Sequence, residues 1–160
     1  MKKQNSPNVK KNWDHKSLHV LLADDDEDDR ELLREAIELV KVDIALHNFA
    51  NGDTLMQHLS QCNDDIPDLI FLDLNMPRKN GIECLVEIRT QKKFTDTVIA
   101  IYSTSAVEED IDSTFHAGAN IYIRKPKNFE VLKKVVSEVL KTNWQYHTSR
   151  LNRENFVMLR

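Results

Sequence analysis

The amino-acid sequence predicts an α/β fold in which one parallel β-sheet lies between two layers of helices. Between residues 18 and 141, short apolar runs of strand length alternate with segments of helical periodicity. The run after Pro67, DLIFLDL, is apolar at successive positions, which is typical of a central strand buried on both faces. Strands that alternate with helices favour parallel pairing through crossover helices.

Each predicted strand is bounded by a change in residue type. The run LHVLLA at 18–23 ends at an acidic block. The run VDIALHNFA at 42–50 alternates apolar and polar side chains, as a half-buried edge strand does. The remaining predicted strands are DLIFLDL (68–74), TVIAIYS (97–103) and NIYIRK (120–125).

Helical periodicity follows every strand. Residues 30–40 and 129–140 place apolar side chains on one helical face, and two shorter helices are predicted at 54–61 and 82–90. The sequence Ser105-Ala-Val-Glu108 matches a capping box, which predicts a helix that begins directly behind the fourth strand. Gly118 stands where a glycine after a helix C-terminus is expected.

Five strand–helix units predict a flavodoxin-like (βα)5 three-layer sandwich with the sheet order 2-1-3-4-5. In such a sheet the functional site lies beyond the carboxyl ends of the strands, at the switch point between strands one and three. The residues at the strand ends are therefore the first candidates for chemistry.

Acidic residues end the first and third predicted strands. Asp24, Asp25 and Asp26 follow the first strand, and Asp73 ends the third, with Asn75 two residues later. Carboxylates gathered at one sheet edge repel one another, so a divalent cation, an ammonium group or both must offset their charge. Mg²⁺ prefers one or two carboxylates together with phosphate oxygens. We therefore expect Asp24, Asp25 and Asp73 to bind Mg²⁺, for which Mn²⁺ could substitute.

The fourth and fifth strands end in groups that can neutralise phosphate oxygens. Ser103 ends the fourth strand, and Lys125-Pro126 ends the fifth. An aspartate can act as the nucleophile in phosphoryl transfer, while a metal, a lysine and a hydroxyl stabilise the transferred oxygens. Taken singly, the acids are equally well explained as helix N-terminal charges and the Lys-Pro pair as a turn. Their coincidence at four strand ends favours a phosphoryl-transfer site.

Four pieces of the sequence together resemble the receiver domain of two-component response regulators. They are LLADDDEDD, DLIFLDLNMPRKNG, VIAIYSTSA and NIYIRKPKNFEVL, in this order, and the resemblance covers about residues 18–141. It implies that Asp73 is the phosphoacceptor and that Asp25 is the direct Mg²⁺ ligand, with Asp24 acting mainly through water. It also implies that the backbone carbonyl of Asn75 completes the metal coordination.

The same resemblance implies roles at the last two strand ends. Ser103 and Lys125 would stabilise the phosphoryl group. Tyr122 would be the aromatic switch residue, which rotates into the space that Ser103 leaves. The resemblance further implies a cis peptide bond between Lys125 and Pro126.

Positions near the phosphoacceptor are expected to set the lifetime of the phosphorylated state. Asn75 and Ser105 flank the path of an attacking water. Two positions depart from the family pattern, since Ser103 stands where threonine is commoner and Lys127 stands where many relatives have an aromatic residue. A serine hydroxyl retains the chemistry, but the neighbouring Thr104 leaves the assignment of the hydroxyl open.

The function expected from these residues is that of a single-domain response regulator. A sensor histidine kinase or a histidine phosphotransfer protein would donate the phosphoryl group to Asp73. The modification would switch a surface that binds a downstream protein, which the sequence does not name. The chain is not expected to be an enzyme beyond catalysing its own phosphorylation and dephosphorylation.

The segments outside 18–141 differ in composition from the predicted domain. Residues 1–17 carry five lysines and one aspartate, which predicts a basic flexible tail. Residues 142–160 are too short for an output domain. We expect this C-terminal extension either to pack on its own domain or to act as a docking or dimerisation arm that forms a homodimer. Its apolar residues are Trp144, Tyr146, Leu151, Phe156, Val157 and Leu159.

Three other functions fit the motifs less well. A Mg²⁺-dependent phosphatase with an aspartate nucleophile carries its acids after the first strand, whereas Asp73 follows the third. A flavodoxin-like electron carrier needs a phosphate loop after strand one, where residues 24–29 are all acidic. A degenerate receiver acting as an unphosphorylated scaffold is disfavoured by the complete set of site residues.

Composition limits the cellular location and the classes of binding partner that are expected. No apolar run is long enough to span a bilayer and no signal peptide is visible, so a cytoplasmic protein without membrane contact is expected. Cys62 and Cys84 give no disulfide framework. The net charge of −4 disfavours nucleic-acid binding. No histidine is expected to bind metal, because the six are scattered without ligand spacing: His15, His19, His47, His58, His116 and His147.

Overall fold

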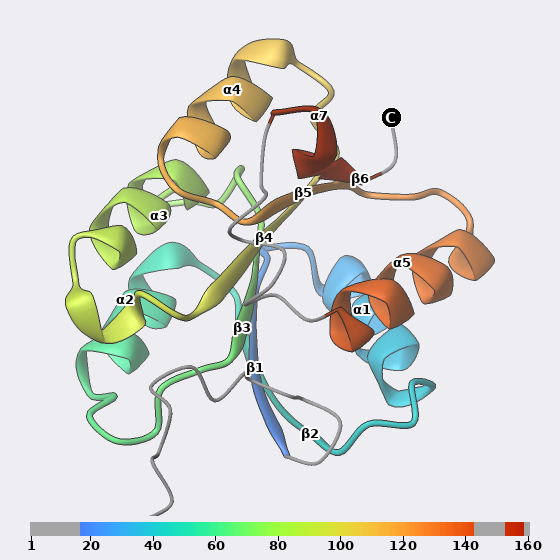
Figure 1. The fold of residues 1–160 in the computed structure, drawn as a ribbon, viewed down its shortest axis with the longest axis horizontal. Coiled ribbons are helices and arrows are strands. Elements are labelled where there is room, and N and C mark those ends of the chain that lie inside the picture. The colour runs from blue at the N-terminus through green and yellow to red at the C-terminus, as the bar shows by residue number, and fades with distance from the viewer. Residues whose placement is uncertain (1–16, 143–152, 159–160) are drawn as a thin grey trace, which may run out of the picture.

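A six-stranded parallel sheet divides the molecule into two helical layers (Figure 1). The computed structural model describes residues 17–142 and 153–158. The strands, in spatial order, are β2 (Ile44–Phe49), β1 (Leu18–Ala23), β3 (Leu69–Leu72), β4 (Val98–Ser103), β5 (Ile121–Arg124) and β6 (Val157–Met158). The expected order 2-1-3-4-5 is confirmed for the first five strands.

Helices cover both faces of the sheet. The helices are α1 (Glu27–Glu38), α2 (Gly52–Ser60), α3 (Gly81–Arg89), the short η2 (Lys92–Phe94), α4 (Glu108–His116), α5 (Phe129–Lys141) and the one-turn α7 (Arg153–Phe156). Helices α1 and α5 lie on one face, and α2, α3 and α4 lie on the other (Figure 1). The predicted three-layer sandwich is therefore confirmed.

Burial along the strands follows the sequence pattern. Strands β1, β3 and β4 are buried at every position, as expected of central strands packed between two helical layers. Edge strand β2 alternates between half-buried and exposed residues over its first four positions. Two hydrophobic cores result, one on each face of the sheet.

Side-chain caps set the start of several helices. Helix α1 begins at Glu27, earlier than predicted, because the Asp26 carboxylate accepts the backbone N–H of Asp29 at 3.1 Å. Helix α3 begins with a capping box in which Asn80 and Glu83 each bind the other's backbone N–H. Acidic residues also occupy the first turn of α1, where the helix dipole favours negative charge.

The predicted capping box at residues 105–108 is wrong. Helix α4 begins at Glu108 with Val107 as its N-cap, two residues later than a helix capped by Ser105 would begin. The Ser105 hydroxyl is engaged elsewhere, since it accepts the N–H of Val107 at 3.2 Å and donates to the Asp110 carboxylate at 2.5 Å. Gly118 follows the end of α4 with a φ of 101°, the left-handed conformation expected there.

The sixth strand was not predicted. Val157 and Met158 pair with Tyr122 and Ile123 of β5, and the preceding Phe156 is fully buried. These described residues of the C-terminal extension therefore pack on the sheet edge. Residues 1–16 lie outside the described part of the chain, as do Trp144, Tyr146, Leu151 and Leu159.

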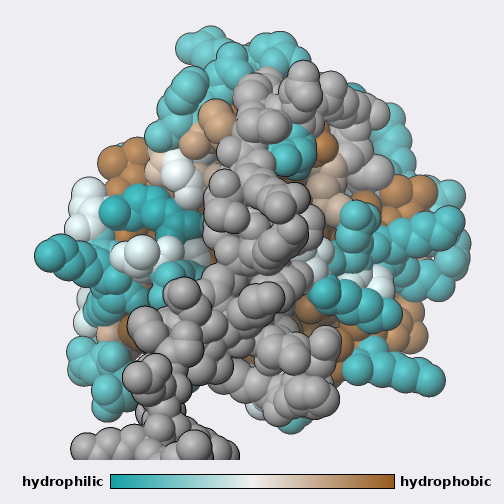
Figure 2. All heavy atoms as spheres, viewed as in Figure 1, coloured by the Kyte–Doolittle hydropathy of each residue, from teal (hydrophilic) through white to brown (hydrophobic). Residues whose placement is uncertain are grey.

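Hydrophobic side chains on the surface come from separate elements. The exposed ones are Leu32 of α1, Leu39 directly after α1, Val86 of α3 and Val107 before α4. Figure 2 shows hydrophobic areas interrupted by hydrophilic side chains on one face of the molecule. Among the described residues, no helix has both the length and the hydrophobicity needed to cross a membrane.

Candidate functional site

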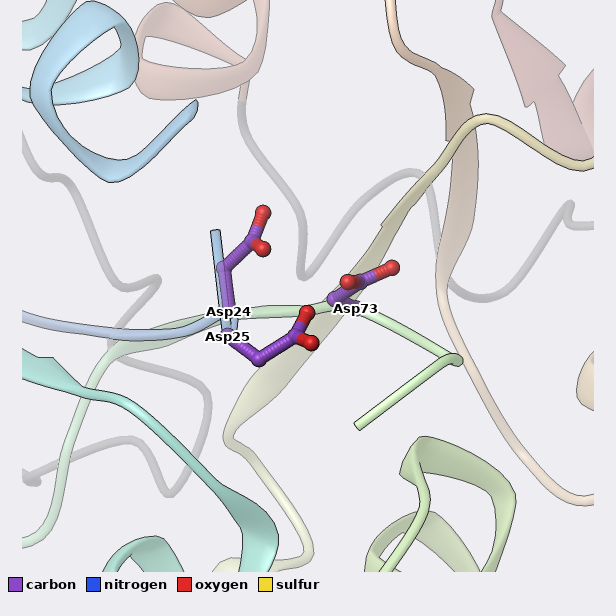
Figure 3. Close-up of side chains that lie close together, drawn as sticks. All are labelled: Asp24, Asp25 and Asp73. Atoms are coloured by element: carbon purple, nitrogen blue, oxygen red, sulfur yellow. The ribbon is translucent and has the colours of Figure 1, made fainter. Parts of the chain in front are cut away.

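Three carboxylates meet at the carboxyl edge of the sheet (Figure 3). Asp24 and Asp25 follow β1, and Asp73 follows the adjacent β3, whose Leu72 pairs with Ala23. Carboxylate oxygens of the three residues lie within 4.8 Å of one another. Asp24 and Asp73 are buried, whereas Asp25 is exposed. The cluster of negative charge is thus mostly buried, and it reaches solvent at Asp25.

Backbone contacts fix the position of Asp73. The N–H of Asp73 donates to the carbonyl of Ala23 at 2.9 Å, which continues the pairing of β1 with β3. The loop after Asp73 returns so closely that a Cβ on Gly81 would lie 2.1 Å from the Asp73 carbonyl oxygen. Only glycine fits this approach, which explains the Asn80-Gly81 pair at the start of α3.

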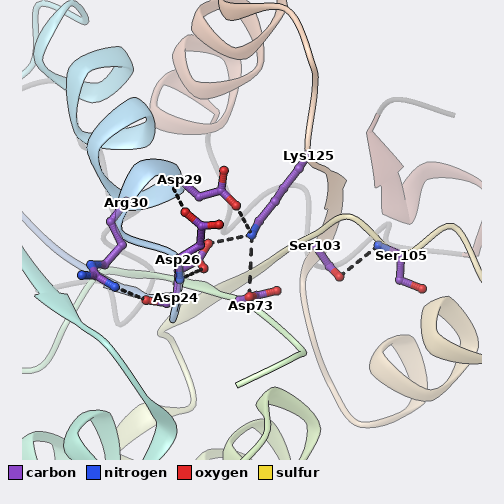
Figure 4. A network of polar contacts seen from close by, with 8 residues as sticks. All are labelled: Asp24, Asp26, Asp29, Arg30, Asp73, Ser103, Ser105 and Lys125. Carbon is purple, nitrogen blue, oxygen red and sulfur yellow. Dashed lines mark hydrogen bonds and ion pairs between the residues drawn. The ribbon is translucent and has the colours of Figure 1, made fainter. Parts of the chain in front are cut away.

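Lys125 connects the carboxylates from the end of β5 (Figure 4). Its Nζ lies 2.8 Å from an oxygen of Asp24, 2.8 Å from an oxygen of Asp29 and 3.6 Å from an oxygen of Asp73. Asp29 had not been predicted as a site residue. Its position in the first turn of α1 suggested only a solvated charge at a helix end. No local sequence pattern could have revealed its role, because its partner Lys125 lies 96 positions later in the chain.

The two oxygens of the Asp24 carboxylate have different partners. Oδ1 accepts the N–H of Asp26 at 2.9 Å, and the backbone carbonyl of Asp24 accepts from the Arg30 guanidinium at 2.7 Å. Oδ2 is buried, and its partner among the described residues is the Lys125 ammonium, whose Nζ lies 2.8 Å away. A buried carboxylate must be paired with positive charge, and here a single ammonium serves several acids.

Burial and charge shift the ionisation of the central residues. Burial raises the pKa of Asp73, and the neighbouring Asp24 raises it further, while Lys125 and the backbone N–H of Asn75 act in the opposite sense. Burial disfavours the charged form of Lys125, but hydrogen bonds to Asp24 and Asp29 more than offset this and raise the pKa of the lysine. The ammonium therefore stays charged, and additional positive charge would favour the ionised form of Asp73.

These donors suit a hard divalent cation. The three aspartates offer only oxygen ligands, and such carboxylates bind Mg²⁺ or Mn²⁺ when other oxygens and water complete the shell. Such an ion would supply the positive charge that the buried carboxylates lack. The exposed Asn75 lies beside the cluster, and its N–H contacts the Asp73 carboxylate.

The hydroxyl of Ser103 lies on the opposite side of Asp73 from the α1 acids (Figure 4). Ser103 is fully buried and its oxygen accepts the N–H of Ser105 at 3.2 Å, whereas Thr104 is exposed. Tyr122 is also fully buried and donates its hydroxyl to the Ser105 carbonyl at 2.9 Å. The tyrosine thus points inward in this structure.

The expected cis peptide bond between Lys125 and Pro126 is wrong. No described residue has a cis peptide bond, so this bond is trans. The trans form is intrinsically favoured before proline by about 0.5–1 kcal/mol. It already allows the ammonium of Lys125 to reach Asp24 and Asp29.

The geometry agrees with comparisons to known proteins. Residues 20–137 match the family model of the response regulator receiver domain. The chain belongs to this family. It is 31% identical over 124 residues to the response regulator Rcp1 of Synechocystis sp., which covers 75% of this chain and 84% of Rcp1. A chemotaxis protein CheY homolog of Campylobacter jejuni is 30% identical over 128 residues, or 78% of this chain and 94% of that protein.

Solved receiver structures share the fold. The crystal structure of the Mn²⁺-bound form of Rcp1 matches with a TM-score of 0.70 at 29% identity, covering 76% of this chain and 91% of that one. The phosphorylated cyanobacterial phytochrome response regulator RcpA matches with a TM-score of 0.72 at 28% identity, covering 86% and 98%. This chain is therefore a receiver domain of two-component signalling.

Proposed function

We propose that Asp73 accepts a phosphoryl group in a Mg²⁺-dependent reaction, from a sensor histidine kinase or a histidine phosphotransfer protein. The observation that supports this most directly is the meeting of Asp24, Asp25 and Asp73 at one strand edge with the Lys125 ammonium among them. An Asp73 oxygen would attack the phosphorus of a phosphohistidine. The P–N bond would break, the imidazole would leave, and an acyl phosphate would remain on Asp73.

The other residues of the site would stabilise the transferred oxygens. A Mg²⁺ ion held by Asp24, Asp25, Asp73 and the Asn75 carbonyl would neutralise charge on the phosphoryl group. Lys125 lies 3.6 Å from the Asp73 carboxylate, so a small movement would bring its ammonium to a phosphoryl oxygen. The Ser103 hydroxyl would donate to another of these oxygens. Asn75 and Ser105 would influence the access of water and hence the lifetime of the acyl phosphate.

We further propose that the surface formed by α4, β5 and residues 153–158 carries the signal. Drawing the Ser103 hydroxyl toward a phosphoryl group would remove it from the N–H of Ser105, whose carbonyl holds Tyr122. Tyr122 in turn packs against Phe156, with ring centres 6.1 Å apart. The C-terminal extension would therefore sense the state of Asp73, and a downstream protein would bind this surface in the cytoplasm.

A phosphodonor experiment tests the phosphoacceptor directly. The protein is incubated with acetyl phosphate, with Mg²⁺ or with EDTA, and its intact mass is measured. We expect one added phosphoryl group with Mg²⁺ and none with EDTA or in Asp73→Asn. Asp64→Asn, which changes an exposed loop carboxylate, serves as the matched control and should be labelled like the wild type. Labelling of Asp73→Asn, or labelling unaffected by EDTA, would contradict the proposal.

A further inference from the structure

Three histidines that are far apart in the sequence lie together on the α2 side of the sheet. His19 comes from β1, His47 from β2 and His58 from α2. Their ring centres are 5.5 Å apart for His19 and His47, 5.9 Å for His47 and His58, and 6.3 Å for His19 and His58. Their sequence spacing gives no hint of this cluster, because parallel pairing and the β2–α2 connection bring them together.

The innermost histidine lacks hydrogen bonds. The side chain of His19 is buried, with 9% of the residue exposed, and neither ring nitrogen makes a hydrogen bond of good geometry to a described residue. Nε2 of His58 is also buried without such a partner. Leaving a buried polar atom unpaired costs about 1–3 kcal/mol. Coordination of a metal ion by Nε2 of His19 and Nε2 of His58 would remove that cost at both atoms.

An adjacent carboxylate can orient His19. Oδ1 of Asp65 lies 3.2 Å from Nδ1 of His19. In metal sites a carboxylate at one ring nitrogen commonly fixes the tautomer and leaves the other nitrogen free to bind the ion. Burial, and then the neighbouring His47 and His19, lower the pKa of His58, which favours the neutral imidazole.

The ring separations are close to those of a three-histidine metal centre. Three imidazoles bound tetrahedrally to one Zn²⁺, each through a nitrogen at about 2.0–2.1 Å, would have ring centres roughly 5 Å apart. The observed separations of 5.5–6.3 Å exceed this only slightly. The ligand nitrogens do not yet converge within 4.8 Å, since the acidic cluster alone meets that limit among the described residues. The rings of the exposed His47 and of the half-buried His58 would have to reorient to close the site.

We propose that His19, His47 and His58 bind a transition-metal ion such as Zn²⁺, with Asp65 orienting His19. Imidazole ligands select ions of this class, whereas the oxygen ligands at Asp73 select Mg²⁺ or Mn²⁺. The two sites lie toward opposite ends of β1, because His19 is near its first residue and Asp24 follows its last. The histidine site would tie β1, β2 and α2 together without requiring phosphorylation.

Calorimetric titration of untagged full-length protein with Zn²⁺, in a large excess of Mg²⁺, tests the site. We expect one Zn²⁺ per chain and a dissociation constant at least about tenfold weaker in His47→Ala, which removes an exposed ligand without opening the core. His116→Ala, an exposed histidine at the end of α4, is the matched control and should bind like the wild type. Asp25→Asn should also leave this binding unchanged, because it alters only the acidic site.

A spectroscopic measurement locates the ion independently of affinity. In imidazole ¹H–¹⁵N spectra, Zn²⁺ should shift the ring nitrogens of His19, His47 and His58 and leave His116 unaffected. Zn²⁺ binding that is equal in the wild type and His47→Ala, or that is lost in Asp25→Asn, would overturn the proposal. So would wild-type protein that binds no Zn²⁺ in excess Mg²⁺.

Discussion

At the scale of single residues, Asp24 and Asp73 are both buried carboxylates at neighbouring strand ends, yet they are held differently. Asp24 accepts a backbone N–H at 2.9 Å and lies 2.8 Å from the Lys125 ammonium. Asp73 lies 3.6 Å from the same ammonium. The less tightly paired carboxylate is the one that can take up a new bond, so the geometry itself favours Asp73 as the nucleophile.

Replacing Lys125 with methionine should destabilise the metal-free protein. The side chain of Lys125 is 8% exposed and its charge compensates the surrounding aspartates. Removing one partner of a buried ion pair costs about 3–5 kcal/mol, so we expect a loss of about 3 kcal/mol in urea unfolding with EDTA. Lys133→Met removes a solvent-accessible pair with Glu130 and should cost less than about 1 kcal/mol. Equal stability of the wild type and Lys125→Met would contradict the role of the lysine.

Asp73→Asn should make metal-free protein more stable at pH 8. Burial raises the folded-state pKa of Asp73 above its unfolded value, so this group's contribution to stability is fully present below the unfolded pKa and is lost as pH rises through the folded pKa. Asparagine avoids that loss. In EDTA at pH 8 we expect a gain of at least about 1.4 kcal/mol, the equivalent of one pKa unit. The difference should shrink toward pH 4, and a constant difference at all pH values would refute the explanation.

At the scale of elements, a helix or strand was predicted correctly when its own residues determine it, and was missed when contacts with other segments do. The apolar runs of β1, β3 and β4 are intrinsic to the chain, so these strands were predicted almost to the residue. The start of α4 was missed because the Ser105 hydroxyl binds Val107 and Asp110 instead of capping a helix. Strand β6 has two residues and exists only because β5 offers an edge.

Within the candidate site, too, some residues were predicted from the sequence and others were missed. Residues at strand ends, such as Asp73 and Lys125, were predicted because parallel strands bring their carboxyl ends together. Asp29 was missed, since its contact with Lys125 depends on how α1 packs beside the end of β5. The trans bond before Pro126 was missed because the cis form was implied by the resemblance alone and by no residue pattern. The gathering of His19, His47 and His58 depends on strand register, which the spacing of histidines in the sequence does not reveal.

Phe156→Ala should release the C-terminal segment from β5. Phe156 is fully buried, and its ring lies 5.2 Å from that of Phe115 and 6.1 Å from that of Tyr122. Truncating a buried phenylalanine typically costs about 3–5 kcal/mol, a large loss for a segment that pairs with β5 over only two residues. We expect faster amide exchange at Tyr122 and Ile123 by hydrogen–deuterium exchange, with little change in Val107→Ala, which alters an exposed side chain. Unchanged exchange in Phe156→Ala would show that the ring does not hold the segment.

At the scale of the whole molecule, a series of contacts runs from Ser103, at the end of β4, to the C-terminal segment. Ser103 contacts the N–H of Ser105, whose carbonyl holds the hydroxyl of Tyr122. Tyr122 contacts Phe156, which directly precedes β6, the strand on the other side of β5 from β4. Coupling between two sites is reciprocal, so an event at Asp73 that favours the inward Tyr122 must be favoured in turn by a docked Phe156.

Phosphorylation should therefore tighten the C-terminal segment. A phosphoryl group that draws Ser103 toward Asp73 leaves more room for the inward Tyr122, against which Phe156 packs. After treatment with acetyl phosphate and Mg²⁺, we expect slower amide exchange at Val157 and Met158 than in untreated protein. Asp73→Asn treated in the same way should show no change, which separates phosphorylation from the effect of the ion. If exchange at Val157 and Met158 is identical before and after phosphorylation of the wild type, the segment is not coupled to the acceptor and only packs on the sheet edge.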